Sequence, residues 1–269
     1  MNKIIQSLTA PDLAESMDNN NVGFWTTYGD HPGGYYKNEP DIAWSVAGLN
    51  FPLYNCFLRY DLAEENFETE LENFMDIIKA HKLPAYFWQA SASKPAGVHE
   101  RLEQSGWKQA RQAPAMAMEI SEVESMEPIP GFTVKPVQND QQRRLWADIL
   151  NRSVGMNDQD ITETIKVELM ISKKNNNLQH RYLGYLNDKP VATGLLHLES
   201  GLAGIYCIAT LPEARRKGLG SFLTIKLIED SSKLGYKVVA LTSSEMGYRV
   251  YSKIGFKDIF SYTNYSLAP

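Results

Sequence analysis

The stretch "ARRKGLGS", from Ala214 to Ser221, combines three cations with two glycines. It follows the apolar run "GIYCIAT", which is typical of a strand, and it precedes apolar residues at helical spacing (Leu219, Phe222, Leu223 and Leu227). The first turn of a helix has backbone N–H groups without internal partners and carries partial positive charge. A strand-to-helix junction of this composition therefore predicts an anion site for a phosphate or pyrophosphate.

The two glycines, Gly218 and Gly220, remove side chains from the loop and let the backbone approach the anion closely. Two other phosphate-binding motifs do not fit. The Walker A string G-x-x-x-x-G-K-[ST] is absent, and the dinucleotide fingerprint lacks its third glycine, because Leu223 occupies that position. The strand before the loop also belongs to a meander and not to a βαβ unit.

The second half of the chain predicts a mixed sheet. Its runs "RYLGYL", "KPVATGLLHL" and "GLAGIYCIAT" are separated only by "ND" and "ESG", which is typical of consecutive antiparallel hairpins. From Phe132 onward the predicted order is strand, two helices, three strands, helix, strand, helix and strand. Such an order implies a sheet with helices on both faces.

The length of 269 residues favours two domains. The best linker is the acidic, proline-containing "SEVESMEPIP" from Ser121 to Pro130, which predicts domains at 1–125 and 126–269. In the first half we expect an initial helix, strands at 42–48, 53–60, 83–90 and 116–120, and helices at 65–80 and 97–108.

Composition and charge exclude several classes of protein. The net charge of -5 argues against nucleic-acid binding, and no apolar run approaches the roughly 18 residues of a membrane helix. The N-terminus does not resemble a secretory signal, and Cys56 and Cys207 are too few for a disulfide framework. No histidine has a partner at ligand spacing. We therefore expect a cytoplasmic protein without a metal.

Three motifs resemble the GNAT (N-acetyltransferase) superfamily. "RRKGLG" matches the superfamily signature R/Q-x-x-G-x-G/A, Pro212 has its usual position before it, and "YRVYSKIGFK" from Tyr248 to Lys257 is similar to the "LYEKLGF" segment. The resemblance covers about Gly131 to Pro269. It implies an α/β fold of the α+β type, with two GNAT-like domains that are each a mixed, mostly antiparallel sheet flanked by helices.

The resemblance also implies an acetyl-CoA site. In this superfamily the fourth strand diverges from the fifth, and its free backbone groups pair with the pantetheine arm; Cys207, Ile208 and Ala209 match those positions. Arg215 and Arg216 would lie near the pyrophosphate. The backbone amides that would hold it belong to Lys217, Gly218, Leu219, Gly220 and Ser221.

Members of the superfamily let the acceptor amine attack the thioester directly, and the thiolate then needs a proton donor. Tyr251 matches the tyrosine of the superfamily, and its reference pKa of about 10 suits that donor. A tyrosine packed in the core is the alternative interpretation, with Tyr248 as the second candidate for the donor. The sequence departs from the common pattern at Ser244 and Gly247, where asparagine and alanine are usual.

The acceptor amine also has to lose a proton. His197 and Glu199 share one face of a meander strand and are candidates for a general base, although a solvated strand edge is the favoured interpretation. Cys207 has no accompanying pattern of histidine and asparagine, so we expect a small buried strand residue there and not a nucleophile.

The first half resembles a degenerate copy of the second. Aligning "VHERLEQSGWK" with "GYRVYSKIGFK" places Leu102 opposite Tyr251, and the acidic "AEENFETE" replaces the loop of glycines and cations. We therefore expect no coenzyme in this half. Its aromatic residues either line an acceptor site or pack in a core (Trp25, Tyr28, Tyr35, Tyr36 and Trp44).

The sequence thus predicts an acetyl-CoA-dependent N-acetyltransferase whose acceptor is a small-molecule or peptide amine, with no nucleic-acid or membrane partner. A non-catalytic acyl-CoA-binding or regulatory protein is the alternative, and a nucleotide-binding interaction domain is a third hypothesis. The sequence leaves open whether the protein is a homodimer.

Overall fold

The computed structural model describes residues 3–90, 93–175 and 177–269. The chain forms two compact units, each made from two segments. Unit 1 comprises Met1–Asn21 and Ala115–Ile259, and unit 2 comprises Val22–Pro114 and Phe260–Pro269.

The sheet of unit 1 is mixed. Its strands follow the order β6, β7, β8, β9, β10 and the last part of β5. The first four form an antiparallel meander, β10 pairs in parallel with β9, and β5 is antiparallel to β10. This confirms the hairpins predicted from "ND" and "ESG". The strand bounds are β5 Lys108–Glu119, β6 Phe132–Pro136, β7 Gln179–Leu186, β8 Lys189–Glu199, β9 Leu202–Thr210 and β10 Val238–Thr242.

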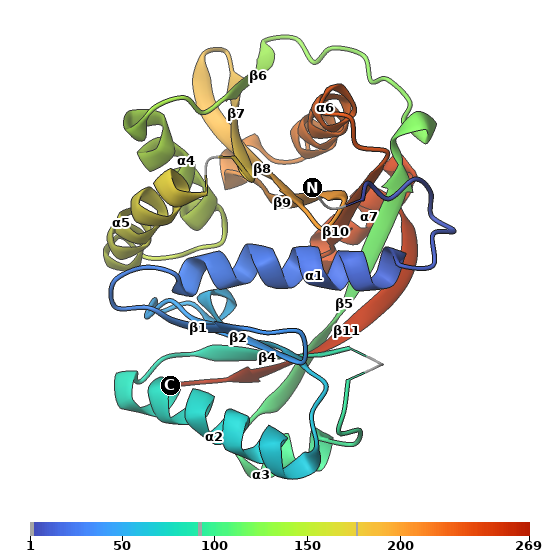
Figure 1. The fold of residues 1–269 in the computed structure, drawn as a ribbon. Helices are drawn as coiled ribbons and strands as arrows, with labels where there is room; N and C mark the ends of the chain where they lie inside the picture. The colour runs from blue at the N-terminus through green and yellow to red at the C-terminus, as the bar shows by residue number, and fades with distance from the viewer. Residues whose placement is uncertain (1–2, 91–92, 176) are drawn as a thin grey trace. The chain divides into compact units, whose positions relative to one another are not determined.

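Helices cover both faces of this sheet, as the sequence predicts. Helices α4 and α5 lie on one side of β7 and β8, and α6 lies on the other (Figure 1). Leu219, Leu223 and Leu227 of α6 are buried in the core of unit 1, which explains their helical spacing. The helices are α4 Asp140–Ser153, α5 Asp158–Lys174, α6 Leu219–Lys233 and α7 Glu245–Ile254. Helix α1, Leu13–Thr26, crosses the boundary between the units.

Side-chain caps fix where three of these helices begin. The side chain of Asn139 accepts a hydrogen bond from the Gln142 amide, and that of Asn157 accepts one from the Asp160 amide. Ser244 accepts one from the amide of Gly247 at the start of α7. Each cap satisfies an amide that the first turn leaves unpaired.

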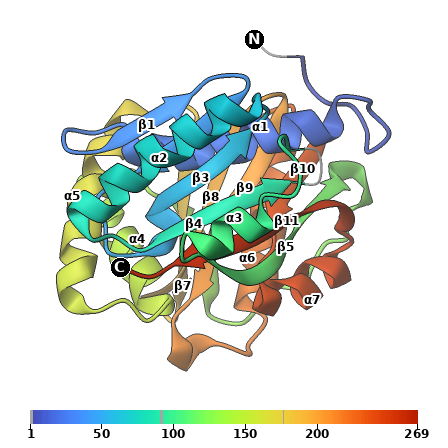
Figure 2. The same cartoon turned by 90° about the horizontal axis from the view of Figure 1, so that it is seen from below.

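Unit 2 has its own core and contains the strands at the other end of the 11-stranded sheet. Its strands follow the order β1, β2, β3, β4 and the last part of β11, and α2 and α3 lie over one face of them (Figure 2). Phe67, Phe74 and Leu102 of these helices are buried against Phe57 and Phe87 of the sheet. The bounds are β1 Tyr35–Asn38, β2 Ile42–Val46, β3 Asn55–Tyr60, α2 Glu64–His81, β4 Ala85–Ala90, α3 His99–Gln104 and β11 Lys257–Leu267.

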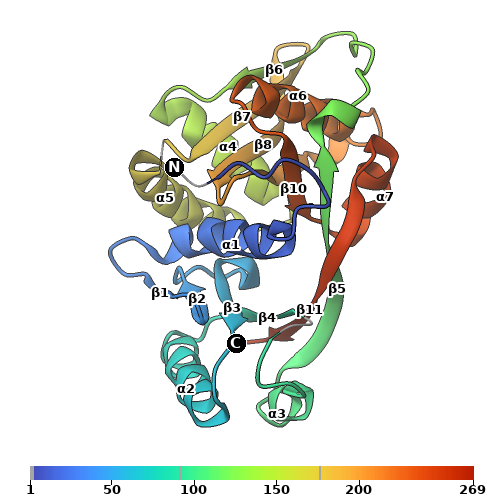
Figure 3. The ribbon, with the colours of Figure 1, turned by 45° about the vertical axis from the view of Figure 1, so that its right-hand side comes forward.

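The last strand of each half of the sequence ends in the unit that is built mainly from the other half. Ala115 to Glu119 of β5, which ends the first half of the sequence, pairs with β10 in unit 1 (Figure 3). Tyr262 to Leu267 of β11, at the end of the chain, pairs with β4 in unit 2. The compact units therefore do not follow the division of the sequence into 1–125 and 126–269. The composition of residues 121–130 identifies a linker in the sequence. It does not show which strands pair with each other, and that pairing determines the compact units.

Short 3-10 helices connect several elements. They are η1 Thr27–Gly29, η2 Pro52–Tyr54, η3 Ile120–Glu122 and η4 Pro212–Ala214. Among the described helices, none combines the length and the apolar composition that crossing a membrane requires.

Candidate functional site

The junction between β9 and α6 is an open helix N-terminus. Gly218 is the N-cap of α6 and has a φ of 77°, in the left-handed region that favours glycine, and it provides no side chain to cap the helix. Within the described chain, the backbone N–H groups from Arg216 to Ser221 have no hydrogen-bond acceptor, and the first amide that does is that of Phe222. These free amides and the helix dipole together favour an anion.

The three cations of the loop differ in their contacts. The Arg215 guanidinium donates to the backbone oxygen of Thr210 at 3.0 Å and to that of Ser153 at 2.5 Å, so it ties the loop to the ends of β9 and α4. Arg216 and Lys217 are exposed, and neither takes part in an ion pair of the described residues. The predicted positive rim therefore consists chiefly of Arg216 and Lys217.

Strands β9 and β10 separate next to this loop. Their pairing involves Ala203 with Val239 and Gly204 with Ala240, and within the described residues it extends no further. Beyond Gly204, β9 continues to pair with β8 on its other side up to Thr210. The β10 side of this part of β9 consequently offers free backbone groups, which is the divergence that the resemblance implies.

A β-bulge lies in the separated part of β9. The register between β8 and β9 shifts between Thr193 and Leu195, and Cys207 has a positive φ of 55°. The Thr193 hydroxyl donates to the Cys207 carbonyl at 2.9 Å, and the Trp146 indole donates to the Gly194 carbonyl at 3.1 Å. These two contacts hold an unusual backbone conformation in place. Burial raises the pKa of the Cys207 thiol, which disfavours a thiolate nucleophile.

Tyr251 lies close to this bulge. Its ring packs edge-on against Phe256 with the ring centroids 5.8 Å apart, and it borders the core of unit 1. Burial raises the pKa of its hydroxyl, and the nearby Cys207 thiol raises it further. The structure thus brings together two residues that the sequence singles out separately. Tyr248 is exposed instead, and its hydroxyl donates to Asp258 at 2.9 Å.

The departures from the superfamily pattern near Tyr251 have structural reasons. A Cβ atom at Gly247 would lie 2.7 Å from the Tyr251 ring, so an alanine at position 247 would displace that ring from its present place. Ser244 serves as the N-cap of α7 through its hydroxyl. The glycine at position 247 is visible in the sequence as a departure from the usual alanine. Only the structure shows that the Tyr251 ring occupies the space where the Cβ atom would lie.

His197 and Glu199 do share one face, but His197 is not on a solvated edge. His197 is fully buried, its Nε2 lies 2.8 Å from the Glu199 carboxylate, and Glu199 is partly exposed. The expectation of a solvated strand edge is therefore wrong for His197. Its register partner is Gly204, three residues before Cys207, which corresponds to about 10 Å along the strand. That separation exceeds hydrogen-bond reach.

Asn20 of α1 organises this end of the strands, and no local pattern in the sequence indicates this role. Its amide donates to the carbonyls of His197 and Glu199 at 3.1 and 3.0 Å and accepts from the Tyr206 hydroxyl at 2.9 Å. A Cβ atom at Gly204 would lie 2.0 Å from the Asn20 Oδ1 atom, so glycine is required for this approach.

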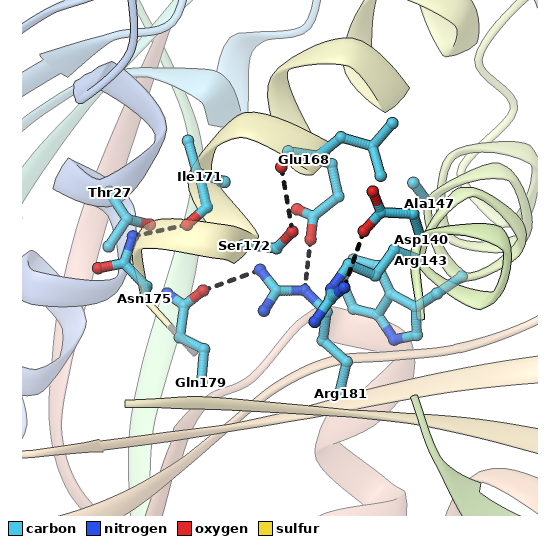
Figure 4. A network of polar contacts seen from close by, with 12 residues as sticks. Thr27, Asp140, Arg143, Ala147, Glu168, Ile171, Ser172, Asn175, Gln179 and Arg181 are labelled. Carbon is cyan, nitrogen blue, oxygen red and sulfur yellow. Dashed lines mark hydrogen bonds and ion pairs between the residues drawn. The ribbon is translucent and has the colours of Figure 1, made fainter. Parts of the chain in front are cut away.

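A buried ion pair joins α5 to β7 (Figure 4). Glu168 of α5 accepts from Arg181 of β7, and their side chains are 2% and 3% exposed. Arg181 also donates to Gln179 at 2.8 Å and lies over the Trp146 ring at 5.4 Å from its centroid. Both charges act on the Cys207 thiol, where Glu168 raises the pKa and Arg181 lowers it. The sequence analysis did not identify this pair.

The corresponding junction of unit 2 has the opposite charge. Helix α2 follows β3 with Ala63 as its N-cap, and Glu64 begins its acidic first turn. Arg101 of α3 forms ion pairs with Glu64 and Glu68. Leu102, the counterpart of Tyr251, is fully buried. An acidic first turn disfavours an anion, and the absence of a coenzyme from this half stays a prediction.

The aromatic residues of unit 2 divide between core and surface. Tyr28 and Trp44 are buried, whereas Tyr35 and Tyr36 of β1 are 44% and 48% exposed. Among the residues that the structure describes, no group of histidine, cysteine, aspartate and glutamate side chains could hold a metal ion.

Comparison with known proteins supports the fold. Residues 182–265 match the family of FR47-like proteins. No curated protein matches the sequence. A GCN5-related N-acetyltransferase from Kribbella flavida has a TM-score of 0.67 at 14% identity, with 94% of this chain and 95% of that chain covered.

Two further solved structures are similar over most of the chain. A functionally unknown conserved protein from Staphylococcus epidermidis has a TM-score of 0.63 at 13% identity and covers 89% of this chain and 96% of its own. A tandem GNAT protein from the clavulanic acid biosynthesis pathway has a TM-score of 0.58 at 8% identity, covering 100% and 98%. The chain therefore has the GNAT fold, as the resemblance predicts.

Proposed function

We propose that the protein transfers an acetyl group from acetyl-CoA to an amine, with the coenzyme held by unit 1. The single observation that carries the proposal is the geometry of β9 and α6. A strand edge free of pairing after Gly204 leads directly to a helix N-terminus whose amides from Arg216 to Ser221 have no acceptors in the described chain. One face thus offers hydrogen bonds to an amide-containing arm and to a diphosphate in succession.

The residues present suit coenzyme A. A Cβ atom added at Gly220 would meet only the Ile208 side chain, at 3.9 Å, so the backbone there is open to a pyrophosphate oxygen. Arg216 and Lys217 supply positive charge beside those amides. The backbone groups of Cys207, Ile208 and Ala209 would pair with the pantetheine amides as a strand pairs with its neighbour.

The chemistry is acyl transfer without a covalent enzyme intermediate. The acceptor nitrogen forms a bond to the thioester carbonyl carbon, the carbon–sulfur bond breaks, and the leaving thiolate takes a proton. Tyr251 is the proposed donor of that proton, since its hydroxyl is near Cys207 and its raised pKa keeps it protonated at neutral pH. Cys207 itself acts through its backbone and not through its thiol.

The proton of the acceptor amine has a less direct route. His197 and Glu199 lie about 10 Å along the strands from the bulge, so either group would act through intervening water. The acceptor is a small-molecule or peptide amine in this proposal, and the fold alone does not favour one of these classes over the other.

Two measurements test the proposal. Isothermal titration calorimetry with CoA should show one binding site for each chain. A ligand that lacks the diphosphate should not bind. A panel of amines with acetyl-CoA should then show release of free thiol with at least one acceptor. Failure of CoA to bind would exclude the proposed function.

The alternative is a non-catalytic acyl-CoA-binding protein. The packing of Tyr251 against Phe256 and the distance of His197 from the bulge are the observations that favour it. In that case CoA would bind to the same loop, but no amine in the panel would accelerate thiol release.

A further inference from the structure

The sheet of unit 2 has a second face, opposite the one that α2 and α3 cover. Phe57, Phe87 and Tyr265 point into the core beneath α2 and α3. Because side chains alternate along a strand, the neighbouring residues Cys56 and Trp88 and, on β11, Asn264 point to the opposite face. Buried polar groups therefore follow one another across β3, β4 and β11.

Several buried polar atoms on this face have no hydrogen-bond partner among the described residues, although the Cys56 thiol donates to the Pro52 and Leu53 carbonyls. Trp88 is 2% exposed and Asn264 is fully buried. Within the described chain, the Trp88 indole N–H and both amide atoms of Asn264 make no hydrogen bond, although the two residues are register partners on adjacent strands. Leaving such groups unpaired in the interior costs free energy, so native proteins normally satisfy them.

Two further donors lie against the same face. The Trp25 ring of α1 lies 6.4 Å from that of Trp88, and the Trp25 indole nitrogen is buried without an acceptor in the described residues. Gln112 of β5 donates to the Thr263 hydroxyl at 3.0 Å, which places the adjacent Arg111 on the Asn264 side of the sheet. The Nε atom of Arg111 is also buried and unpaired.

We call Trp25, Trp88, Arg111 and Asn264 the polar row. Its unpaired atoms are mostly donors, with the Asn264 carbonyl as the only unpaired acceptor of the four side chains. Burial raises the pKa of the neighbouring Cys56 thiol, and the Trp88 indole and then the positive charge of Arg111 lower it. No carboxylate of the chain is among the groups that shift that pKa.

Other indoles of the chain show how the protein satisfies such donors. Trp44 donates to Glu70 at 3.2 Å and Trp146 donates to the Gly194 carbonyl at 3.1 Å. Trp107 is unpaired like Trp88, but it packs among the aromatic residues of the opposite face, where its ring contacts Phe74 and Phe87. The polar row is different because several donors and one cation converge.

We propose that the polar row binds a small carboxylate, whose oxygens accept hydrogen bonds from Trp88, Asn264 and Arg111 while the indole rings flank its apolar part. A carboxylate accepts several hydrogen bonds and pairs with a guanidinium, which matches an excess of donors beside one cation. The proposal concerns unit 2 alone and does not rest on acetyltransferase activity.

The indole N–H signals allow a direct test on the intact protein. In nitrogen-15 spectra of the tryptophan-labelled chain, acetate or benzoate should shift the signals of Trp25 and Trp88 in a saturable manner. The signals of Trp44 and Trp146 should stay in place, because their N–H groups already have acceptors. Sodium chloride at matched ionic strength controls for general salt effects.

The ligand panel distinguishes a carboxylate from other occupants. Acetamide and benzamide have nearly the same shape without the charge, and inorganic phosphate has charge without the planar group. Binding of the carboxylates alone supports the proposal. Equal shifts with the neutral amides, shifts with phosphate only, or no shift with any ligand would overturn it, the last result indicating ordered water on these donors.

Variants locate the site. Asn264→Leu and Trp88→Phe should each weaken carboxylate binding by about tenfold to a hundredfold, as expected for a lost hydrogen bond to a charged group. Trp107→Phe is the matched control, since it changes an equally buried and unpaired indole on the other face and should leave binding unchanged. If Trp88→Phe does not fold, the titration of the wild-type chain still decides the question.

Discussion

The two units contain the same connection, a strand followed by a helix and a parallel strand, with opposite charge at the start of the helix. In unit 1, β9 leads through a loop with two exposed cations to α6, whose first turn has no acidic residue. In unit 2, β3 leads to α2, whose first turn contains Glu64 and Glu65. The acidic residues in α2 complement the helix dipole from within the chain, whereas the first turn of α6 contains no such residue.

The comparison continues at the next helix. Tyr251 of α7 borders the bulge at Cys207, whereas its counterpart Leu102 of α3 is fully buried in the core of unit 2. One backbone arrangement thus supports a candidate site in one unit and simple packing in the other. The side chains at a few positions decide between these outcomes, and they can be exchanged experimentally.

The largest effect is expected at Tyr251. Tyr251→Phe should lower kcat by about 100-fold to 10,000-fold, the range of general acid catalysis, and leave CoA affinity unchanged. Steady-state kinetics and calorimetry would separate the two. Tyr248→Phe is the matched control because its hydroxyl bonds to Asp258 at the surface. Unchanged turnover in Tyr251→Phe would remove this residue from the mechanism.

The pH dependence of kcat provides an independent check on the same residue. Burial raises the pKa of Tyr251 above the ordinary value of about 10, so the hydroxyl remains protonated below that pH. We expect no loss of kcat from this group as the pH rises to about 10, and a decline beyond it. An alkaline loss centred near neutral pH would point to another proton donor.

The next effect concerns stability. Glu168→Ala leaves Arg181 buried without its partner and should lower the free energy of unfolding by about 3–5 kcal/mol. Glu70→Ala in unit 2 removes a carboxylate that bonds to Lys37 and Trp44 in a more exposed place and should cost about 1 kcal/mol. Chemical denaturation would measure both. Equal losses would contradict the difference in burial.

Coenzyme binding should respond to a negative charge at the helix tip. Gly220→Glu introduces a carboxylate before the free amides of α6 and should weaken CoA binding about 100-fold. Ser232→Glu places the same charge at the exposed far end of α6 and should have little effect on CoA affinity. If Gly220→Glu bound CoA as tightly as the parent protein, the loop would not be the pyrophosphate site.

The smallest effect is expected in unit 2. Glu65→Gln removes a favourable charge from the first turn of α2 and should lower the free energy of unfolding by about 0.5 kcal/mol. Thermal unfolding followed by circular dichroism would detect the change. CoA affinity should remain that of the parent protein. If the variant bound a second CoA molecule, the acidic charge alone would account for the lack of CoA binding in unit 2.

Much of the fold could be predicted because its signals are local. The apolar spacing of Phe67, Leu71 and Phe74 predicts α2, and the turn residues at Asn187 and Asp188 predict the hairpin between β7 and β8. The loop with Gly218 and Gly220 was likewise visible, since its chemistry lies in consecutive residues. Local sequence determines helices, hairpins and helix termini because their hydrogen bonds join residues close in the chain.

The remaining features depend on partners that are distant in sequence. Nothing in "KQARQAPAMAME" indicates that its end pairs with β10, more than a hundred residues later. The burial of His197, the bulge at Cys207 and the pair of Glu168 with Arg181 also require segments that meet only in the folded chain. The sequence by itself therefore determined the elements and the anion-binding loop of this protein. Tertiary structure decided which strands complete each sheet and which polar groups are buried, because these depend on long-range packing.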